Sequence, residues 1–309
     1  MPLPYVTLIT GKGGTGKSST AGALALALAK HSQTVLGDLD QRQSSARMLK
    51  LELNGRTSTR AMDNLEFRPL GADQELERFI EQIVPLKAIS RRMLRSHTFG
   101  YVTAALPGLE AFLILDRLRQ FADEAAARDG FAVIDAPASG GLLQLLRVPQ
   151  GLRDLAPSGT LNRLAGEIAE FLADPQRFGV WVTAWPERLA IREALETLAV
   201  LRNELGIRSL AVILNGVPEP LFLPTDYPRI RGLAAHRALA LERKTAVELA
   251  MRARKQFERA RVTVIELPML YTEDFQRAEL EQLADVLDRL SQADSRGEPI
   301  PASKNVRRR

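Results

Sequence analysis

The stretch GKGGTGKSS, residues 11–19, stands between two segments of different character. The apolar run 5–10 before it predicts a buried strand, and the alanine- and leucine-rich run 20–30 after it predicts a helix. Strand, glycine loop and helix in this order favour a phosphate-binding loop over a glycine-rich turn without ligand. Glycines let backbone N–H groups curl around phosphate oxygens, and the helix adds its positive dipole end. We expect Lys17 to bind the β- and γ-phosphates and Ser18 to ligate Mg²⁺.

Composition limits the size of the domain and the kinds of metal site. With 309 residues, 45% of them hydrophobic, the chain can bury one large core, and we expect a single domain over residues 1–290. The basic segment 291–309 is too polar to pack and is expected to be a disordered tail. The chain has no cysteine and only three scattered histidines, which excludes disulfides and thiolate metal sites. The expected metal is therefore Mg²⁺ that arrives with nucleotide.

Hydropathy and charge bear on location and partners. No apolar run approaches the roughly 20 residues that span a bilayer, and residues 1–4 carry no charged region or cleavage signal. We therefore expect a cytoplasmic protein without an integral membrane segment. The net charge of +5 could attract nucleic acid or anionic lipid, but such a balance more often reflects solubility. Nucleic acid is not expected as a partner, and peripheral membrane contact stays open.

Two aspartates follow the second predicted strand, residues 34–39. Asp38 and Asp40 stand at its carboxyl end, which faces the same crevice as the phosphate loop. We assign Asp40 to orienting the attacking water. Asp38 would not touch the nucleotide itself: it would contact either a residue of the site or a water molecule bound to the metal. An aspartate before a helical run such as 44–51 also caps helices, but the upstream loop favours the catalytic interpretation.

A further acidic residue closes the next core strand. Residues 131–134 are apolar and are followed by Asp135, the arrangement of a Walker B strand. Asp135 would bind the hydration shell of Mg²⁺. The small, glycine-containing segment 136–141 after it suits a loop that senses the γ-phosphate and moves on hydrolysis.

The segment between these strands is expected to be a helical insertion, at about residues 71–129. Residues 51–64 look irregular, and residues 65–70 predict a short strand that Pro69 breaks. The helical spacing of apolar residues predicts a helix over 73–84, and we expect a basic helix over 88–95 and another helix over 110–129. The insertion could contact a client or a second subunit, or could pack as ordinary core.

The rest of the chain alternates strands and helices, which predicts an α/β fold of the P-loop NTPase type, with a mostly parallel, helix-covered sheet. Residues 142–146 are expected to begin a helix or a segment next to the second switch, which Pro149 interrupts. Asn215 could read adenine through its amide donor and acceptor, or Asn-Gly could simply turn the chain. Pro268 follows the last strand and could border adenine. The predicted strands are 179–183, 209–214 and 262–267, and the helices are 161–172, 189–205, 234–260 and 275–290.

Lysines on both sides of the glycines, Lys12 and Lys17, give the pattern Lys-Gly-Gly-Thr-Gly-Lys-Ser. This resembles the deviant Walker A group, which includes ArsA, the tail-anchored-protein targeting ATPase, ParA and MinD. Residues 35–43 and 134–146 look like the first and second switches of the ArsA-like ATPases, and residues 107–110 like a motif of their helical insertion. The resemblance covers nearly the whole chain and is strongest to the bacterial, cytoplasmic branch.

The resemblance implies a residue-by-residue assignment of an ATP and Mg²⁺ site. Lys12 would reach across a dimer interface to the partner's nucleotide. Asp40 would position water, Asp135 would serve Mg²⁺, and Asn215 with Pro268 would frame adenine. The nucleotide-binding residues would be Lys12, Gly13, Gly14, Thr15, Gly16, Lys17, Ser18 and Ser19.

The sequence departs from the family pattern in informative places. Arsenite-pump members bind the metalloid through cysteines, and this chain has none, so arsenite transport is not expected. The targeting branch often uses a Cys-x-x-Cys zinc site and a methionine-rich client groove, whereas this chain lacks the pair and has six methionines. Gln41 replaces the usual proline of the first switch, and Gly141 replaces a frequent histidine of the second.

These observations lead to an expected function. We expect a Mg²⁺-ATP-hydrolysing dimer, either a homodimer or a heterodimer with a paralogue, whose closure on ATP is coupled to a protein partner or client. One alternative is a ParA- or MinD-like positioning ATPase that acts on DNA or membrane. The helical insertion and the lack of a strongly amphipathic carboxyl-terminal helix speak against it. Another is a nucleotide-bound scaffold with low turnover.

Overall fold

The computed structural model of the chain describes residues 3–39, 43–52, 58–71, 75–76, 78, 108–155, 158–220 and 234–295. Within these ranges the strands are β1 (Val6–Gly11), β2 (Thr34–Asp38), β3 (Thr59–Met62), β4 (Leu65–Pro69), β5 (Phe131–Asp135), β6 (Phe178–Ala184), β7 (Ser209–Val217) and β8 (Thr263–Pro268). They form an eight-stranded sheet in the order β3-β4-β2-β5-β1-β6-β7-β8. Every pairing is parallel except that of β3 with β4, so the predicted α/β class is confirmed.

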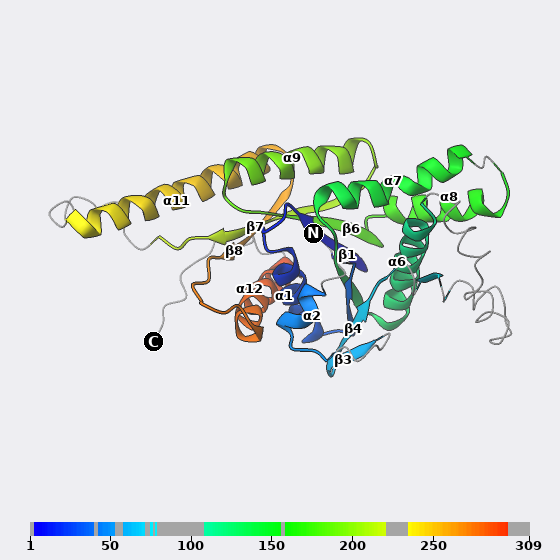
Figure 1. Cartoon of the computed structure of the whole chain (residues 1–309), viewed down its shortest axis with the longest axis horizontal. Helices are drawn as coiled ribbons and strands as arrows, with labels where there is room; N and C mark the ends of the chain where they lie inside the picture. Colours follow the sequence, from blue (N-terminus) through cyan, green and yellow to red (C-terminus); the bar gives the residue numbers. More distant parts are fainter. Residues whose placement is uncertain are drawn as a thin grey trace, which may run out of the picture.

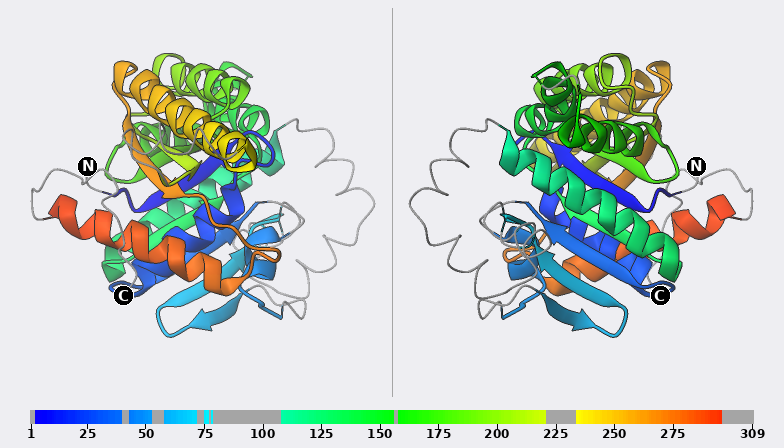
Figure 2. Two further views of the ribbon diagram at one scale, coloured as in Figure 1. Left: turned by 90° about the vertical axis from the view of Figure 1, so that its left-hand side faces the viewer. Right: turned by 90° about the vertical axis from the view of Figure 1, so that its right-hand side faces the viewer.

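Helices cover both faces of this sheet (Figures 1 and 2). The described helices are α1 (Lys17–Ala29), α2 (Ser44–Met48), α6 (Leu109–Arg128), α7 (Ser139–Leu155), α8 (Thr160–Ala173), α9 (Arg188–Asn203), α11 (Ala234–Arg259) and α12 (Arg277–Ser295). Helices α1, α2 and α12 lie on one face, and α6, α7, α8, α9 and α11 lie on the other. Among the described residues, no helix combines the length and the apolar character needed to cross a bilayer.

The central strand β1 shows why the core divides into two halves. All its residues are buried. Val6 and Leu8 pack in the hydrophobic cluster under α6 to α9 and α11, whereas Ile9 packs in the cluster under α1 and α12. Successive side chains of a strand point to opposite faces, so a strand covered on both faces is mostly apolar, as β1 is apart from its two buried threonines. This is why the core strands appear in the sequence as continuous apolar runs.

The interval 51–64, expected to be irregular, contains the strand β3 (Thr59–Met62). β3 is short, polar and antiparallel, and it pairs only with β4 at the edge of the described sheet. An edge strand needs few apolar residues, so the hydrophobic pattern does not reveal it. Pro69, expected to break β4, is the last residue of that strand and stands opposite Asp38 of β2.

Helix α7 corrects a second expectation. It runs without interruption from Ser139 to Leu155, although Pro149 was expected to interrupt it. A proline inside a helix costs about 3 kcal/mol relative to alanine. Pro149 is buried, and α7 packs against α6, α8 and α9. Tertiary packing therefore outweighs the local preference.

The expected helical insertion is described only in part. Helix α6 (Leu109–Arg128) matches the predicted helix 110–129 and packs against β1 and β5 as an ordinary layer of the fold. Most of the predicted helix 73–84, the helix 88–95 and the first residue of the motif 107–110 lie outside the described residues. At the other end, α12 continues to Ser295, five residues into the predicted tail, and residues 296–309 are not described.

The attachment of α11 to the sheet can be tested with Phe257, which is fully buried under the carboxyl-terminal part of this helix. We expect Phe257→Ala to lower the free energy of unfolding by about 3–5 kcal/mol, because it removes a buried ring and leaves a cavity. Met251→Ala, on the same helix at a side chain that is 56% exposed, is the control and should change it by less than about 0.5 kcal/mol. Urea unfolding measures both. Equal effects of the two substitutions would contradict the packing.

Candidate functional site

The glycine loop connects the end of β1 directly to the first turn of α1. Gly14 and Gly16 adopt left-handed backbone angles, with φ of 82° and 86°. A Cβ atom at Gly13 or Gly14 would meet no atom within 4 Å, so the loop backbone borders open space. Gly16 is the N-cap of α1 and offers no side-chain hydrogen bond to the helix. The first N–H groups of α1 therefore remain for an anion, as a phosphate site requires.

A pair of threonines holds the loop against β6. The Thr15 hydroxyl lies 2.7 Å from the carbonyl oxygen of Lys12 and 2.7 Å from the hydroxyl of Thr183. The Thr183 hydroxyl also lies 3.0 Å from the carbonyl oxygen of Thr10. Each hydroxyl has one proton to donate, so two of these three contacts are hydrogen bonds at any one time. The contacts bind the loop to the next strand of the sheet.

Asn215 fastens the loop from β7. Its Nδ2 donates to the carbonyl oxygen of Thr15 at 3.0 Å, and its Oδ1 accepts from the N–H of Gly216 at 3.0 Å. Asn215 and Gly216 lie inside β7, where the register with β8 shifts between Leu214 and Val217. The interpretation of Asn-Gly as a chain turn is therefore wrong. The adenine-reading role of Asn215 stays a prediction.

The acidic strand ends lie side by side. Asp38 of β2 and Asp135 of β5 are register partners, and their exposed fractions are 2% and 1%. Asp135 is also the partner of Ile9 in β1, two residues before the loop begins. The Oδ2 atom of Asp38 accepts a 2.7 Å hydrogen bond from Ser45, which ties β2 to α2. The sheet thus brings both carboxylates to the carboxyl edge that carries the loop, while Asp40 lies outside the described residues.

The remaining predicted residues lie at the same end of the sheet, where the strands have their carboxyl termini. Lys17, the first residue of α1, places its Nζ 3.5 Å from the carbonyl oxygen of Lys12, and Ser18 follows it in the helix. Ser19 donates through its hydroxyl to the carbonyl oxygen of Gly16 at 3.0 Å. Pro268 ends β8 and stands opposite Val217 in register. These positions are compatible with ATP and Mg²⁺ binding, which stays a prediction for each residue.

Glu193 of α9 is a neighbour of the loop that the sequence did not indicate. Its Oε2 lies 3.9 Å from the Nζ of Lys12, and its Oε1 accepts a 2.8 Å hydrogen bond from Ser139. In the sequence, Glu193 is one of several charged residues on an amphipathic helix, a pattern typical of a solvated face. Only the placement of α9 beside the loop distinguishes it.

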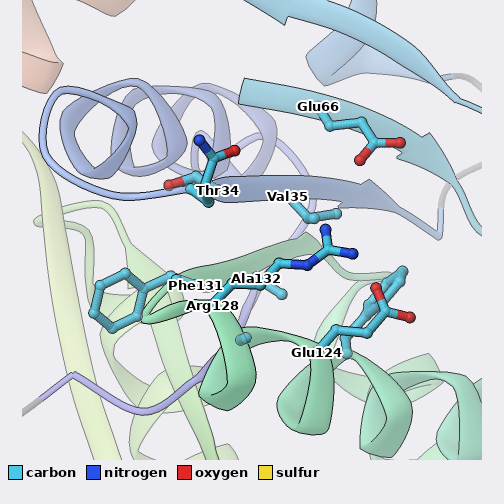
Figure 3. A pocket seen from close by; sticks show the side chains of 11 residues that line it. Thr34, Val35, Glu66, Glu124, Arg128, Phe131 and Ala132 are labelled. Carbon is cyan, nitrogen blue, oxygen red and sulfur yellow. The ribbon is translucent and has the colours of Figure 1, made fainter. Parts of the chain in front are cut away.

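A pocket lined in part by charged side chains lies at the amino-terminal ends of β2 and β5, opposite the strand ends that carry the glycine loop (Figure 3). Thr34 and Phe131, the first residues of β2 and β5, line it together with Glu66, Glu124 and Arg128. Its empty volume is about 400 Å³, part of which is open solvent. Ligands of parallel α/β sheets bind at the carboxyl ends of the strands, so this pocket is not the candidate nucleotide site.

The charged partners of the carboxyl groups with shifted pKa values lie on β4, on α6 and at Arg78, not on the loop. A hydrogen bond from Arg68, at 2.7 Å, lowers the pKa of Glu66 in β4. Burial raises the pKa of Glu75, whose side chain is 3% exposed and lies 3.7 Å from Arg78. These groups form part of a charged network between β4 and α6. Their shifts therefore give no indication of acid–base catalysis at the loop.

The left-handed angle at Gly16 can be tested directly. We expect Gly16→Ala to destabilise the fold by about 1–3 kcal/mol, because it combines a strained backbone angle with a Cβ atom only 2.2 Å from the Nδ2 atom of Asn215. Gly166→Ala is the control, since this glycine lies inside α8 and a Cβ atom there would meet nothing within 4 Å. Thermal unfolding compares them. A Gly16→Ala protein as stable as the control would contradict the described loop.

Part of the chain is similar to known proteins. The family model described as anion-transporting ATPase, that of ArsA, matches residues 5–156. The ATPase BagA of Mycobacterium tuberculosis is 28% identical over 221 residues, which are 67% of this chain and 64% of that protein. A Halobacterium salinarum protein named "Putative arsenical pump-driving ATPase" is 25% identical over 240 residues, 71% of this chain and 35% of that protein. The chain thus spans less than two thirds of the length of these relatives.

The family match includes the glycine loop and both buried aspartates, and it confirms the resemblance predicted from the sequence. By this match, residues 5–156 are similar to the anion-transporting ATPase family, the ArsA family.

Proposed function

We propose that the chain binds ATP with Mg²⁺ at the glycine loop and hydrolyses its terminal phosphoanhydride bond. The observation that carries this proposal is the loop itself, whose open, left-handed backbone leads into an uncapped helix N-terminus beside two buried carboxylates. The names of the relatives, all ATPases, support the same reaction.

Each residue would have a separate role that follows from its position in the site. Lys17 and the first N–H groups of α1 would bind the phosphates, and Ser18 with Asp135 would hold Mg²⁺ and its water shell. Bound Mg²⁺ would neutralise part of the charge on the phosphate oxygens. Asp40 would orient the attacking water. Catalysis of this kind needs little beyond positioning and electrostatic stabilisation, which suits a site built from backbone and fixed strand ends.

We further propose that the ATP-bound form is a dimer, homomeric or formed with a paralogue, and that its closure is coupled to a protein partner or client. Lys12 is the residue that suggests this. Its side chain is 37% exposed, and it stands at the start of the loop, whereas Lys17 stands at the end. A partly exposed ammonium group is available to a nucleotide held by a second subunit, as the resemblance implies.

Two substitutions separate binding from hydrolysis. Lys17→Ala should abolish binding of Mg²⁺-ATP, because it removes the cation nearest the phosphates. Asp40→Asn should keep binding and lower the hydrolysis rate by about 100-fold or more, because the attacking water loses its orienting carboxylate. Calorimetry and phosphate release measure the two steps. Asp63→Asn, at a side chain that is 97% exposed, is the control and should behave as wild type. Wild-type hydrolysis by Asp40→Asn would remove Asp40 from the mechanism.

Subunit mixing tests whether Lys12 acts across a dimer. Each of Lys12→Ala and Lys17→Ala alone should be inactive, but co-expressed chains should recover about one quarter of the wild-type rate. Half of the dimers would then be mixed, and each mixed dimer would contain one site with its own Lys17 and the partner's lysine. The double variant Lys12→Ala/Lys17→Ala, co-expressed with Lys12→Ala, is the control and should recover nothing. If Lys12 acts within its own chain, no mixture recovers activity.

A further inference from the structure

The carboxylate of Glu193 connects Lys12, at the start of the glycine loop, to the start of α7. Glu193 of α9 accepts a hydrogen bond from Ser139, the first residue of α7, and its other oxygen faces the ammonium group of Lys12 at 3.9 Å. α7 begins four residues after Asp135, so Ser139 lies within the segment 136–141 that is expected to respond to the γ-phosphate. Glu193 therefore touches both parts of the site whose positions should depend on nucleotide.

The two contacts of Glu193 differ in strength. Ser139 is 4% exposed, and its 2.8 Å bond to a carboxylate is a charge-assisted hydrogen bond of ordinary length. Lys12 and Glu193 have side chains 37% and 35% exposed, and their charged atoms are 3.9 Å apart. Exposed ion pairs of this length contribute little, because water screens them. Glu193 is thus anchored on the α7 side and holds Lys12 reversibly.

The segment before α7 is itself connected to the loop strand. The Thr10 hydroxyl donates to the carbonyl oxygen of Pro137 at 2.8 Å, and Ala136 donates its N–H to the carbonyl oxygen of Ile9. A shift of residues 136–138 would therefore move Ser139, and with it the carboxylate of Glu193. This gives a short mechanical route from the second switch to Lys12.

We propose that Glu193 is a positioning residue for Lys12: bonded to Ser139, it holds the ammonium group beside α9 until a triphosphate attracts it away. This inference rests on the proposed function. The triphosphate carries more negative charge than one carboxylate, so it wins the competition for Lys12. A diphosphate lacks the γ-phosphate that Lys12 would meet. Glu193 therefore weakens triphosphate binding selectively and makes the lysine return after hydrolysis.

The test compares Glu193→Gln with wild type by calorimetry, at one protein concentration, using Mg²⁺ with adenylyl imidodiphosphate and Mg²⁺ with ADP. Glutamine can still accept the Ser139 hydrogen bond but does not attract Lys12. We expect the apparent Kd for the triphosphate analogue to fall by up to about fivefold, the most that an exposed pair supplies. The Kd for ADP should not change. Glu196→Gln, on the same helix in an exposed pair with Arg192, is the control and should leave both Kd values unchanged.

The effect must pass through Lys12. In a Lys12→Ala background, Glu193→Gln should change neither Kd. A change that persists there, or an equal change for both nucleotides, overturns the proposal. If Glu193 only braces α7, then Ser139→Ala and Glu193→Gln lower the thermal midpoint alike and leave the ratio of the two Kd values as in wild type, which also overturns it.

Two outcomes distinguish a failure of the proposed function from a failure of the proposed role of Glu193. A wild-type chain that binds neither nucleotide contradicts the proposed function, whereas a wild-type chain that binds both, with an unchanged ratio in Glu193→Gln, contradicts only the role of Glu193. Glu193→Asp, which keeps the charge but is one methylene shorter, is the second variant should Glu193→Gln not fold. It should shift the ratio in the same direction by a smaller factor.

Discussion

The turn from β1 into α1 is the constraint on which the rest of the structure depends. Two of its glycines adopt left-handed backbone angles, and the turn must stay open to an anion while it remains fixed. β1 lies inside the sheet between β5 and β6, and the strands on its two sides contribute different residues to the site. The side with β6 and β7 supplies Thr183 and Asn215, which hold the loop. The side with β5 and β2 supplies the buried carboxylates.

Much of the fold could be predicted because its central strands are buried on both faces. Such strands appear as continuous apolar runs, and the runs at 131–134 and 179–183 lie within one or two residues of β5 and β6. The prediction failed where local pattern and tertiary packing disagree. β3 is a polar edge strand without an apolar run, and Pro149 lies inside α7 because packing offsets its local cost.

The residues of the candidate site could also be predicted from the sequence only in part. Lys17, Ser18 and Asp135 could be assigned because each belongs to a contiguous motif whose structural context is visible in the sequence. The contacts that hold the loop could not. Thr183 lies 168 residues from Thr15, and Asn215 lies 200 residues from it, so the order of strands in the sheet decides that they meet. Glu193 could not be found either, because its charge resembles any solvated helix position until α9 is placed beside the loop.

Hydrogen–deuterium exchange of the wild-type chain, with and without Mg²⁺-ATP, tests the central claim most directly. If the loop binds the phosphates, nucleotide slows exchange chiefly in residues 11–19, because phosphate oxygens accept hydrogen bonds from the loop and helix N–H groups. Smaller effects are expected at the ends of β2 and β5. Unchanged exchange at residues 11–19, or protection centred on the pocket between Glu66 and Arg128 at the other edge of the sheet, would contradict it.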